Sequence, residues 1–175
     1  SQPYIEPMPF NLPILLTWLR IVAIPLLIAV YYLPAGWVTG HERDVAATTL
    51  FIAAAVTDWA DGFLARWLNQ TSAFGAFLDP VADKLMVAAA LIVLVQLGRT
   101  DAIVATIIIG REITISALRE WMARIGAAKS VAVSMLGKIK TVAQMVAIPM
   151  LLYYEDFLGI DCRHLGIWLM WIAAL

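Results

Sequence analysis

Four aspartates lie within a 26-residue stretch of a chain that is otherwise largely hydrocarbon: Asp58, Asp61, Asp79 and Asp83. The first two are three positions apart and the last two are four apart, so each pair shares one face of a helix. Carboxylates are costly in an apolar medium and usually mark a site there. Two neighbouring helices would offer four oxygen-rich groups, which the hard divalent cations Mg²⁺, Mn²⁺ and Ca²⁺ prefer. With no His or Cys nearby, zinc is disfavoured. We therefore expect one or two divalent ions, and two such ions can clamp phosphoryl oxygens.

Small residues lie one helical turn from three of these aspartates. They are Gly62, Ala65 and Gly75. Missing side chains beside the carboxylates would let a ligand approach the helix backbone closely. Arg66, one turn further on, could grip a diphosphate with two hydrogen bonds. The alternative is that the small residues serve helix–helix packing. Beside four acids and an arginine, we favour the ligand.

A second group of polar side chains, all cationic, interrupts the later apolar segments. Its members are Arg111, Arg119, Lys138 and Lys140. An anionic head group would need such a cradle. The alternative is that these side chains reach out of the membrane toward anionic lipid. That alternative suits Arg111 and Lys138 less well, because Glu112 and Gly137 beside them indicate a packed polar pocket.

The composition points to a polytopic membrane protein. The chain has 175 residues, 62% of them hydrophobic, and a mean hydropathy of +0.84, more apolar surface than a soluble domain of this size can bury. A net charge of −1 gives no basic field, so nucleic acid is not expected as a partner. The first residues lack the basic region and cleavage site of a secretory signal peptide.

The apolar runs predict an all-α fold of six transmembrane helices joined by short polar loops. The expected spans are 12–33, 45–67, 73–97, 102–122, 131–154 and 165–175. The last is shorter than the roughly 20 residues a span needs, so we expect either that the natural chain continues or that this helix is cut short. Residues before Leu12 could lie along the membrane interface as a short amphipathic segment. No repeat and no second domain are visible, so we expect a single domain over residues 1–175.

Basic residues predict the orientation of these spans. With a cytoplasmic N-terminus, nine of the 12 Lys and Arg residues fall on the cytoplasmic side and three on the other, as the positive-inside rule requires. All four aspartates then gather near the cytoplasmic face, because one pair ends an inward-going helix and the other begins the next outward-going helix. The short loop 69–72 would place these two helices side by side, so that the pairs can meet.

A long motif in this chain resembles the signature of the CDP-alcohol phosphotransferase family. It reads Asp58-x-x-Asp61-Gly62-x-x-Ala65-Arg66, then eight residues, then Gly75-x-x-x-Asp79-x-x-x-Asp83. Segments 11–20, 111–123 and 130–141 are similar to a bacterial branch of that family which makes phosphatidylglycerophosphate. The resemblance therefore covers nearly the whole chain.

The resemblance implies a fold of six transmembrane helices, usually a homodimer, in the bacterial cytoplasmic (inner) membrane with a polar cavity facing the cytoplasm. It also implies transfer of the phosphatidyl group of CDP-diacylglycerol to an alcohol, with release of CMP. For this branch the acceptor would be sn-glycerol 3-phosphate.

The resemblance also suggests a role for each candidate residue. It makes metal ligands of Asp58, Asp61 and Asp79, and makes Asp83 both a ligand and the general base for the acceptor hydroxyl. The groups that would hold the CDP moiety are Gly62, Ala65, Arg66 and Gly75. The acceptor phosphate would need basic residues, and the candidates are Arg111, Lys138, Arg119 and Lys140. A carboxylate beside divalent ions is a weak base, so proton transfer would need help from the metal or come late in the transition state.

Other functions fit parts of the same pattern. Inositol phosphate, serine or phosphatidylglycerol could be the acceptor with the same core motif. A divalent-cation transporter would also place carboxylates in its spans, but here the acids lie near one face and no pair of broken helices is visible. A lipid-scaffold protein would have little reason to keep four charges in an apolar medium.

Overall fold

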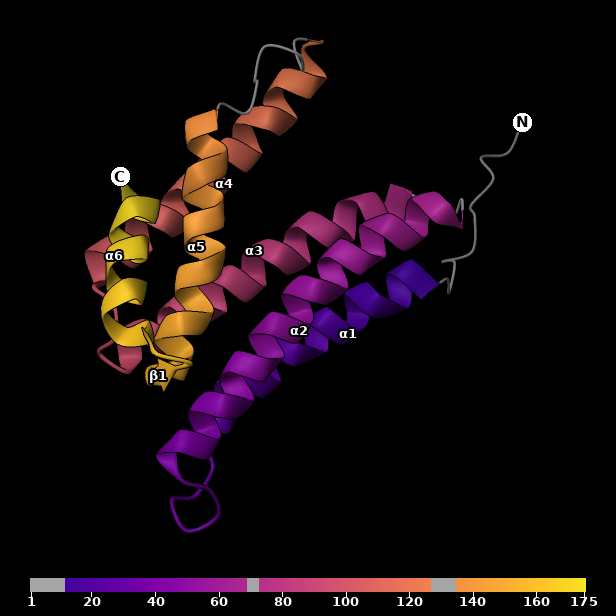
Figure 1. The fold of residues 1–175 in the computed structure, drawn as a ribbon. Coiled ribbons are helices and arrows are strands. Elements are labelled where there is room, and N and C mark those ends of the chain that lie inside the picture. The colour runs from indigo at the N-terminus through magenta and orange to yellow at the C-terminus, as the bar shows by residue number, and fades with distance from the viewer. Residues whose placement is uncertain (1–11, 69–72, 127–134) are drawn as a thin grey trace.

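The computed structural model describes residues 12–68, 73–126 and 135–175, which form six α-helices and one short β-hairpin (Figure 1). The elements are α1 (Leu12–Val30), α2 (Gly40–Trp67), α3 (Ala73–Gln96), α4 (Ala102–Arg124), α5 (Met135–Tyr153), β1 (Asp156–Phe157), β2 (Ile160–Asp161) and α6 (Cys162–Ala174). The fold is therefore helical, as expected, apart from the hairpin. The interfacial segment expected before Leu12 lies outside the described residues.

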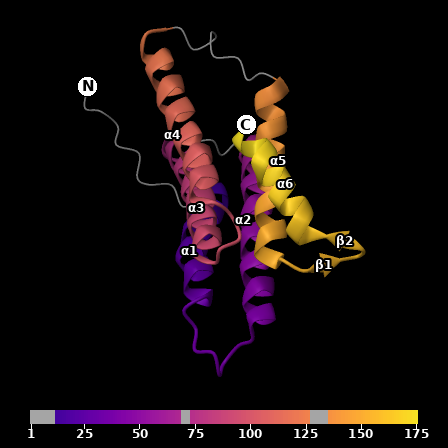
Figure 2. The same ribbon diagram turned by 90° about the vertical axis from the view of Figure 1, so that its left-hand side faces the viewer.

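Helix α1 forms one group and helices α4, α5 and α6 form another, and both groups pack against α2 and α3. Helix α1 packs along both α2 and α3, and these three helices run alongside one another in Figure 1. In Figure 2, α4 lies in front of α3 and α5 in front of α2. Helices α5 and α6 pack on each other, α5 also contacts α2 and α3, and α4 contacts α3 and α6. This arrangement places α1, which carries two polar residues in its middle, directly against the helices that carry the four aspartates.

Helix α2 begins five residues earlier than the sequence indicated. The expected spans 12–33 and 45–67 left residues 41–44 in the polar loop between them, and this expectation was wrong. The Thr39 hydroxyl accepts a hydrogen bond from the backbone N–H of Glu42 at 3.1 Å, and this cap begins the helix. Glu42 in the first turn also interacts favourably with the positive end of the helix dipole, so the polar residues extend the helix instead of ending it.

The polar segment between α5 and α6, expected as a loop, contains the hairpin of β1 and β2. Its turn residues Leu158 and Gly159 both have positive φ, at 51° and 81°, as the tightest hairpin turns require. Asp161 ends the hairpin and caps α6 by accepting from the His164 backbone N–H at 3.2 Å. The His164 ring also contacts this carboxylate and holds the pKa of Asp161 below its usual range. The cap starts α6 three residues earlier than expected.

Two of the described helices, α1 and α5, are long and apolar enough to cross a membrane. Helices α2, α3 and α4 exceed 20 residues but carry charged side chains in the half that holds the aspartates or the basic group, and α6 has 13 residues. The six-span topology therefore remains a prediction for these four helices.

Large apolar side chains cover the outward faces of several helices. Exposed examples from four different helices are Val56, Trp67, Ile103, Val142 and Trp168. Soluble monomers rarely expose so much apolar surface. The surface therefore agrees with a protein whose surroundings are hydrocarbon.

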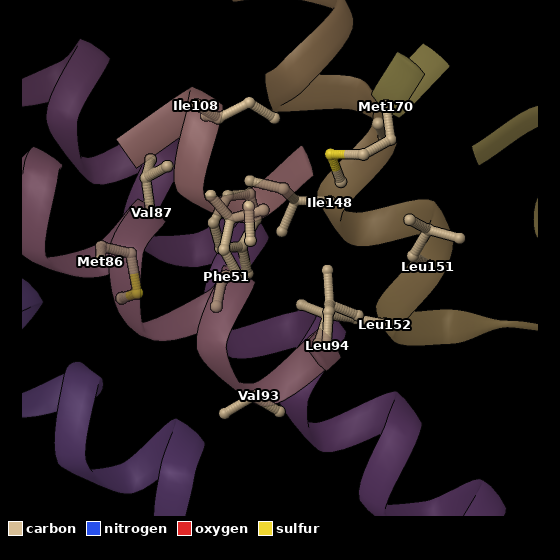
Figure 3. Close-up of a cluster of buried hydrophobic side chains, with 14 of the residues drawn as sticks. Phe51, Met86, Val87, Val93, Leu94, Ile108, Ile148, Leu151, Leu152 and Met170 are labelled. Atoms are coloured by element: carbon tan, nitrogen blue, oxygen red, sulfur yellow. The ribbon is translucent and has the colours of Figure 1, made fainter. Parts of the chain in front are cut away.

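A buried apolar cluster joins all six helices (Figure 3). Phe51 of α2 stands at its centre, with Ile148 of α5 and Met170 of α6 on one side and Met86 and Val87 of α3 on the other. Phe51, Met86 and Val87 also line the polar cavity described below. The core thus forms the floor of that cavity.

A largely buried ion pair closes the end of the bundle opposite the four aspartates. The Arg99 guanidinium lies 2.9 Å from a carboxylate oxygen of Asp44 and donates to the carbonyl oxygens of Leu151 and Leu152 at 3.1 and 2.8 Å. Tyr31 donates its hydroxyl to the same carboxylate at 3.1 Å. These bonds tie α1, α2 and α5 to the connection between α3 and α4.

Candidate active site

Three helices bring the four aspartates together. Helix α2 contributes Asp58 and Asp61 from one face, and α3 contributes Asp79 and Asp83 from one face, as their spacing predicts. Both pairs point at α1, where they contact Thr17 or Arg20. The carboxylates therefore share one place in the fold, within reach of the same two side chains.

The Arg20 guanidinium stands among three of the carboxylates. Its Nη1 lies 2.8 Å from an oxygen of Asp83 and 3.1 Å from an oxygen of Asp58, and its Nη2 lies 3.1 Å from Asp61. Arg20 as a whole is only 2% exposed. Charge-assisted bonds of this kind are strong in a water-poor site, so Arg20 links α1 to both acidic helices.

Thr17 contacts one carboxylate from each acidic helix, Asp61 of α2 and Asp79 of α3. Its hydroxyl oxygen lies 2.6 Å from Asp61 Oδ2, 2.5 Å from Asp79 Oδ1 and 3.0 Å from the Pro13 carbonyl oxygen. A hydroxyl has one proton, so it donates to only one of these oxygens at a time. Two carboxylates drawn to one hydroxyl repel each other unless positive charge lies close by.

A cavity of about 390 Å³ opens beside this cluster. Asp58, Asp79 and Asp83 line it together with Arg20 and residues of α4 and α5. The side chains of Asp58 and Asp83 are 43% and 40% exposed, whereas that of Asp61 is 2% exposed. Asp58 and Asp83 therefore face the cavity, and Asp61 lies behind them.

The donor set has the chemistry of a site for Mg²⁺ or Mn²⁺. The groups are carboxylates without His or Cys among the residues that line the cavity, which is what hard divalent ions select. Three basic residues, Arg20, Lys84 and Arg119, line the cavity with the acidic residues Asp58, Asp79, Asp83 and Glu112, and Asp61 lies behind them. The five acids outnumber the three bases, so negative charge remains to be compensated. In the arrangement seen, no three acidic, His or Cys side chains of the described ranges are placed to hold a metal ion. Metal binding would require Arg20 to give up some of its contacts with these carboxylates.

The residues expected to hold CDP lie beyond the carboxylates, toward the connection between α2 and α3. Gly62 and Arg66 are exposed, and Ala65 and Gly75 are partly exposed. A Cβ added at Gly62 would meet no other atom within 4 Å, so tight packing within the described chain does not explain this glycine. None of the four lines the cavity beside the aspartates.

The four basic candidates for the acceptor phosphate line a second cavity, of about 540 Å³, between α4 and α5. This basic cavity contains Arg111, Arg119, Lys138 and Lys140. Glu112, Arg119 and Thr141 line both cavities, so the basic cavity adjoins the carboxylates. The sequence placed the aspartates and the basic residues on different helices and did not show that they lie next to each other.

Arg111 differs from the other three basic residues because its guanidinium already has neighbours. It donates to the Ala173 carbonyl oxygen at the end of α6 and, at 3.2 Å, to the side-chain oxygen of the buried Gln144. These bonds join α4, α5 and α6. Arg111 therefore holds the wall of the basic cavity and has fewer donors left for a ligand than Lys138 or Arg119.

Sequence reasoning missed Thr17 and Arg20 as site residues. The signal was present, because they are the two polar side chains within an otherwise apolar α1 and are three positions apart. That spacing puts them on one face of the helix, and an arginine inside an apolar span usually has an acidic partner. What the sequence lacked was the packing of α1 against both α2 and α3.

Comparison with known proteins identifies the class to which this site belongs. The chain belongs to the CDP-alcohol phosphatidyltransferase family, whose model matches residues 10–175.

Curated relatives narrow the comparison to one activity. A protein of Escherichia coli (strain K12) and one of Shigella flexneri serotype 5b (strain 8401) are each 49% identical to this chain over 170 residues. The match covers 96% of this chain and 89% of each relative. Both relatives are named CDP-diacylglycerol–glycerol-3-phosphate 3-phosphatidyltransferase.

Proposed function

We propose that this chain is an enzyme that transfers the phosphatidyl group of CDP-diacylglycerol to sn-glycerol 3-phosphate. The products are phosphatidylglycerophosphate and CMP. The observation that carries this proposal is the shared wall between the carboxylate cavity and the basic cavity. Such a pair of adjoining sites suits a reaction between a diphosphate ester and a phosphorylated alcohol. The names of the relatives that are 49% identical support the same reaction.

The carboxylate cluster would bind the diphosphate through divalent ions. Asp58, Asp61, Asp79 and Asp83 would hold Mg²⁺ or Mn²⁺, in our proposal two ions. Bound there, the ions would compensate the charge of the diphosphate and polarise the phosphoryl oxygens. The chain's own groups complete the donor site: Arg66 would grip the diphosphate, and the small side chains of Gly62, Ala65 and Gly75 would leave room for the nucleotide.

Asp83 is the group we propose as general base. Its carboxylate faces the cavity, where an acceptor hydroxyl reaching in from the basic cavity would come within its range. The acceptor oxygen forms a bond to the phosphorus of the phosphatidyl group, the bond from that phosphorus to the CMP oxygen breaks, and Asp83 receives the hydroxyl proton. CMP then leaves with the bridging oxygen.

The basic cavity would hold the phosphate of the acceptor. Lys138 and Arg119 are exposed, and Lys140 is partly exposed, so their charged groups are available to a phosphate entering from the same side. Arg111 would act mainly on the cavity wall, because part of its guanidinium is engaged by Ala173 and Gln144. Glu112 at the junction would keep the phosphate away from the carboxylate side.

The setting we propose is the bacterial cytoplasmic (inner) membrane. The chain would cross it several times as one domain over residues 1–175, form a homodimer, and open its site to the cytoplasm, from which the water-soluble acceptor would enter and into which CMP would leave. The outward-facing apolar side chains and the apolar helices α1 and α5 support the membrane location.

A direct assay of the acceptor tests the proposal. Purified protein is given labelled CDP-diacylglycerol with Mg²⁺ and, in parallel, glycerol 3-phosphate, inositol phosphate, serine or phosphatidylglycerol. We expect a labelled lipid product and an equal amount of CMP with glycerol 3-phosphate alone. A product with another acceptor and none with glycerol 3-phosphate would contradict the acceptor assignment but keep the chemistry. Ion flux in liposomes without CMP release would contradict both.

Substitution of Lys138 tests the basic cavity. In Lys138→Gln we expect the KM for glycerol 3-phosphate to rise about 10- to 100-fold, the range for loss of one charged hydrogen bond, with a smaller change in kcat. Arg124→Gln is the matched control, because Arg124 ends α4, the other helix that lines the basic cavity, but pairs with Glu120 at 2.9 Å in solvent and lines neither cavity. An unchanged KM in Lys138→Gln would remove this residue from the acceptor site.

A further inference from the structure

We propose that Arg20 is the internal counterion of the carboxylate cluster. It holds the two aspartate pairs together while no divalent ion is bound, and its contacts with Asp58 and Asp83 give way when an ion binds. The inference rests on the proposed function in one respect: it takes these carboxylates as the ion's ligands. It assigns Arg20 a positioning role that is separate from the chemistry of the reaction.

The burial of Arg20 shows that its charge needs these partners. A guanidinium stays protonated in proteins, and a buried charge is very costly unless it is paired. Arg20 is 2% exposed, and its described ionic partners are Asp58, Asp61 and Asp83. The aspartates therefore hold Arg20 in place as much as Arg20 holds them.

The way Arg20 distributes its donors indicates what fixes its position. Its Nε is buried and has no hydrogen-bond partner within the described structure, whereas both terminal nitrogens point at carboxylates. An unsatisfied buried donor costs free energy. The contacts of both Nη atoms with the aspartates offset this cost. This distribution of donors is expected of a counterion and not of a residue that only fills space.

The two terminal nitrogens have different surroundings. Nη2 contacts Asp61, whose side chain is 2% exposed, whereas Nη1 contacts Asp58 and Asp83, whose side chains are 43% and 40% exposed and face the cavity. An ion arriving through the cavity meets the second set first. We therefore infer that the Asp61 contact persists and that the Nη1 contacts are the ones exchanged.

A divalent ion and Nη1 compete for the same oxygens. Nη1 lies 3.1 Å from Asp58 Oδ1 and 2.8 Å from Asp83 Oδ1, and the guanidinium occupies the space between the two helices. Within the described ranges, no three candidate ligands are yet placed around a common centre. Binding of the ion thus replaces the positive charge of Nη1 beside these oxygens with the positive charge of the ion. While no ion is bound, Arg20 keeps the mutually repelling carboxylates close together.

The melting temperature with and without metal separates this role from ordinary packing. We measure Arg20→Gln and wild type in detergent, in EDTA and in saturating Mn²⁺, and follow Mn²⁺ binding by electron paramagnetic resonance. In EDTA we expect Arg20→Gln to melt about 10 °C below wild type, the order expected for breaking a buried ion pair in a chain of this size. With Mn²⁺ we expect less than half of that loss, because the ion compensates the same carboxylates.

Arg99→Gln is the matched control. It also removes one arginine from an ion pair with an aspartate, Asp44, at the opposite end of the bundle, where the two side chains are 13% and 11% exposed. We expect its loss in melting temperature to be the same in EDTA and in Mn²⁺. We also measure Arg20→Lys, which keeps the charge but not the contacts of two separate nitrogens. This variant decides the question if Arg20→Gln cannot be recovered from membranes. We expect Arg20→Lys to lose about half as much in EDTA as Arg20→Gln and to recover in Mn²⁺.

The outcomes distinguish this inference from the proposed function. If the Arg20 variants lose equally with and without Mn²⁺ while Mn²⁺ still binds and stabilises wild type, Arg20 is a packing residue and the inference is overturned, but the metal site stands. If Mn²⁺ neither binds nor stabilises wild type, the metal assignment itself fails and takes the inference with it. A stabilisation by Mn²⁺ that is larger in both Arg20 variants than in wild type supports the inference.

Discussion

Asparagine at any one of the four clustered aspartates is expected to lower kcat at least about 10³-fold. Asn keeps the size and one oxygen of Asp58, Asp61, Asp79 or Asp83 but removes its charge. Loss of a ligand charge weakens stabilisation of the phosphoryl group, and at Asp83 it also removes the general base, whose contribution alone is commonly about 10²–10⁴-fold. The measurement is CMP release by purified protein at saturating substrates.

The fold should survive these substitutions to different degrees. Asp58 and Asp83 are half-exposed, and loss of either charge leaves Arg20 two other carboxylate partners, so these Asn variants should melt closer to wild type than Asp61→Asn, which weakens buried bonds to Arg20 and Thr17. Asp101→Asn is the matched control, because Asp101 caps α4 by accepting from Ile103 N–H at 2.7 Å and Asn caps equally well. If an Asn variant of one of the four aspartates retains more than about a tenth of wild-type turnover, that aspartate does not belong to the site.

The part of this site that the sequence predicts is the part fixed by helix periodicity. Spacings of three and four positions put each aspartate pair on one helix face, and a short connection makes α2 and α3 neighbours. These facts are local, so they can be read from residues that are close in the chain. The helix interiors followed from the apolar runs for the same reason.

The parts that could not be predicted depend on residues distant in the chain. Thr17 and Arg20 lie more than 35 positions before Asp58, the first of the four clustered aspartates, and their partners follow from how α1 packs against both α2 and α3. The bonds from Arg111 to Ala173 and Gln144 likewise require α4, α5 and α6 to meet. A cationic residue in an apolar helix predicts that a partner exists, but only the packing says which one.

The predicted starts of α2 and α6 were wrong because capping residues begin each helix before its apolar run. The apolar pattern placed the start of α2 at Val45, yet Thr39 and Glu42 begin the helix earlier by hydrogen bonding and charge. Asp161 does the same for α6. Polar residues at the end of an apolar run are thus ambiguous between a loop and a helix cap, and the backbone bonds of the structure resolve the ambiguity.

Removal of divalent ions is expected to abolish CMP release while leaving the protein folded. Without the ions, the diphosphate would meet the uncompensated charge of the carboxylate cluster, and we expect turnover in EDTA to fall at least about 10³-fold. Mg²⁺ or Mn²⁺ should restore it. Zn²⁺ should restore it poorly, because carboxylate oxygens without His or Cys suit it less well.

The protein should stay folded in EDTA because Arg20 provides positive charge within the cluster. This is checked by helical circular dichroism and by the melting temperature, measured on the sample whose CMP release is assayed. Wild type treated with EDTA and then given excess Mg²⁺ is the control for irreversible damage. Full turnover in EDTA would contradict a metal-dependent reaction at these aspartates. Loss of turnover together with loss of helix would instead mean that the ions, and not Arg20, hold the two acidic helices together.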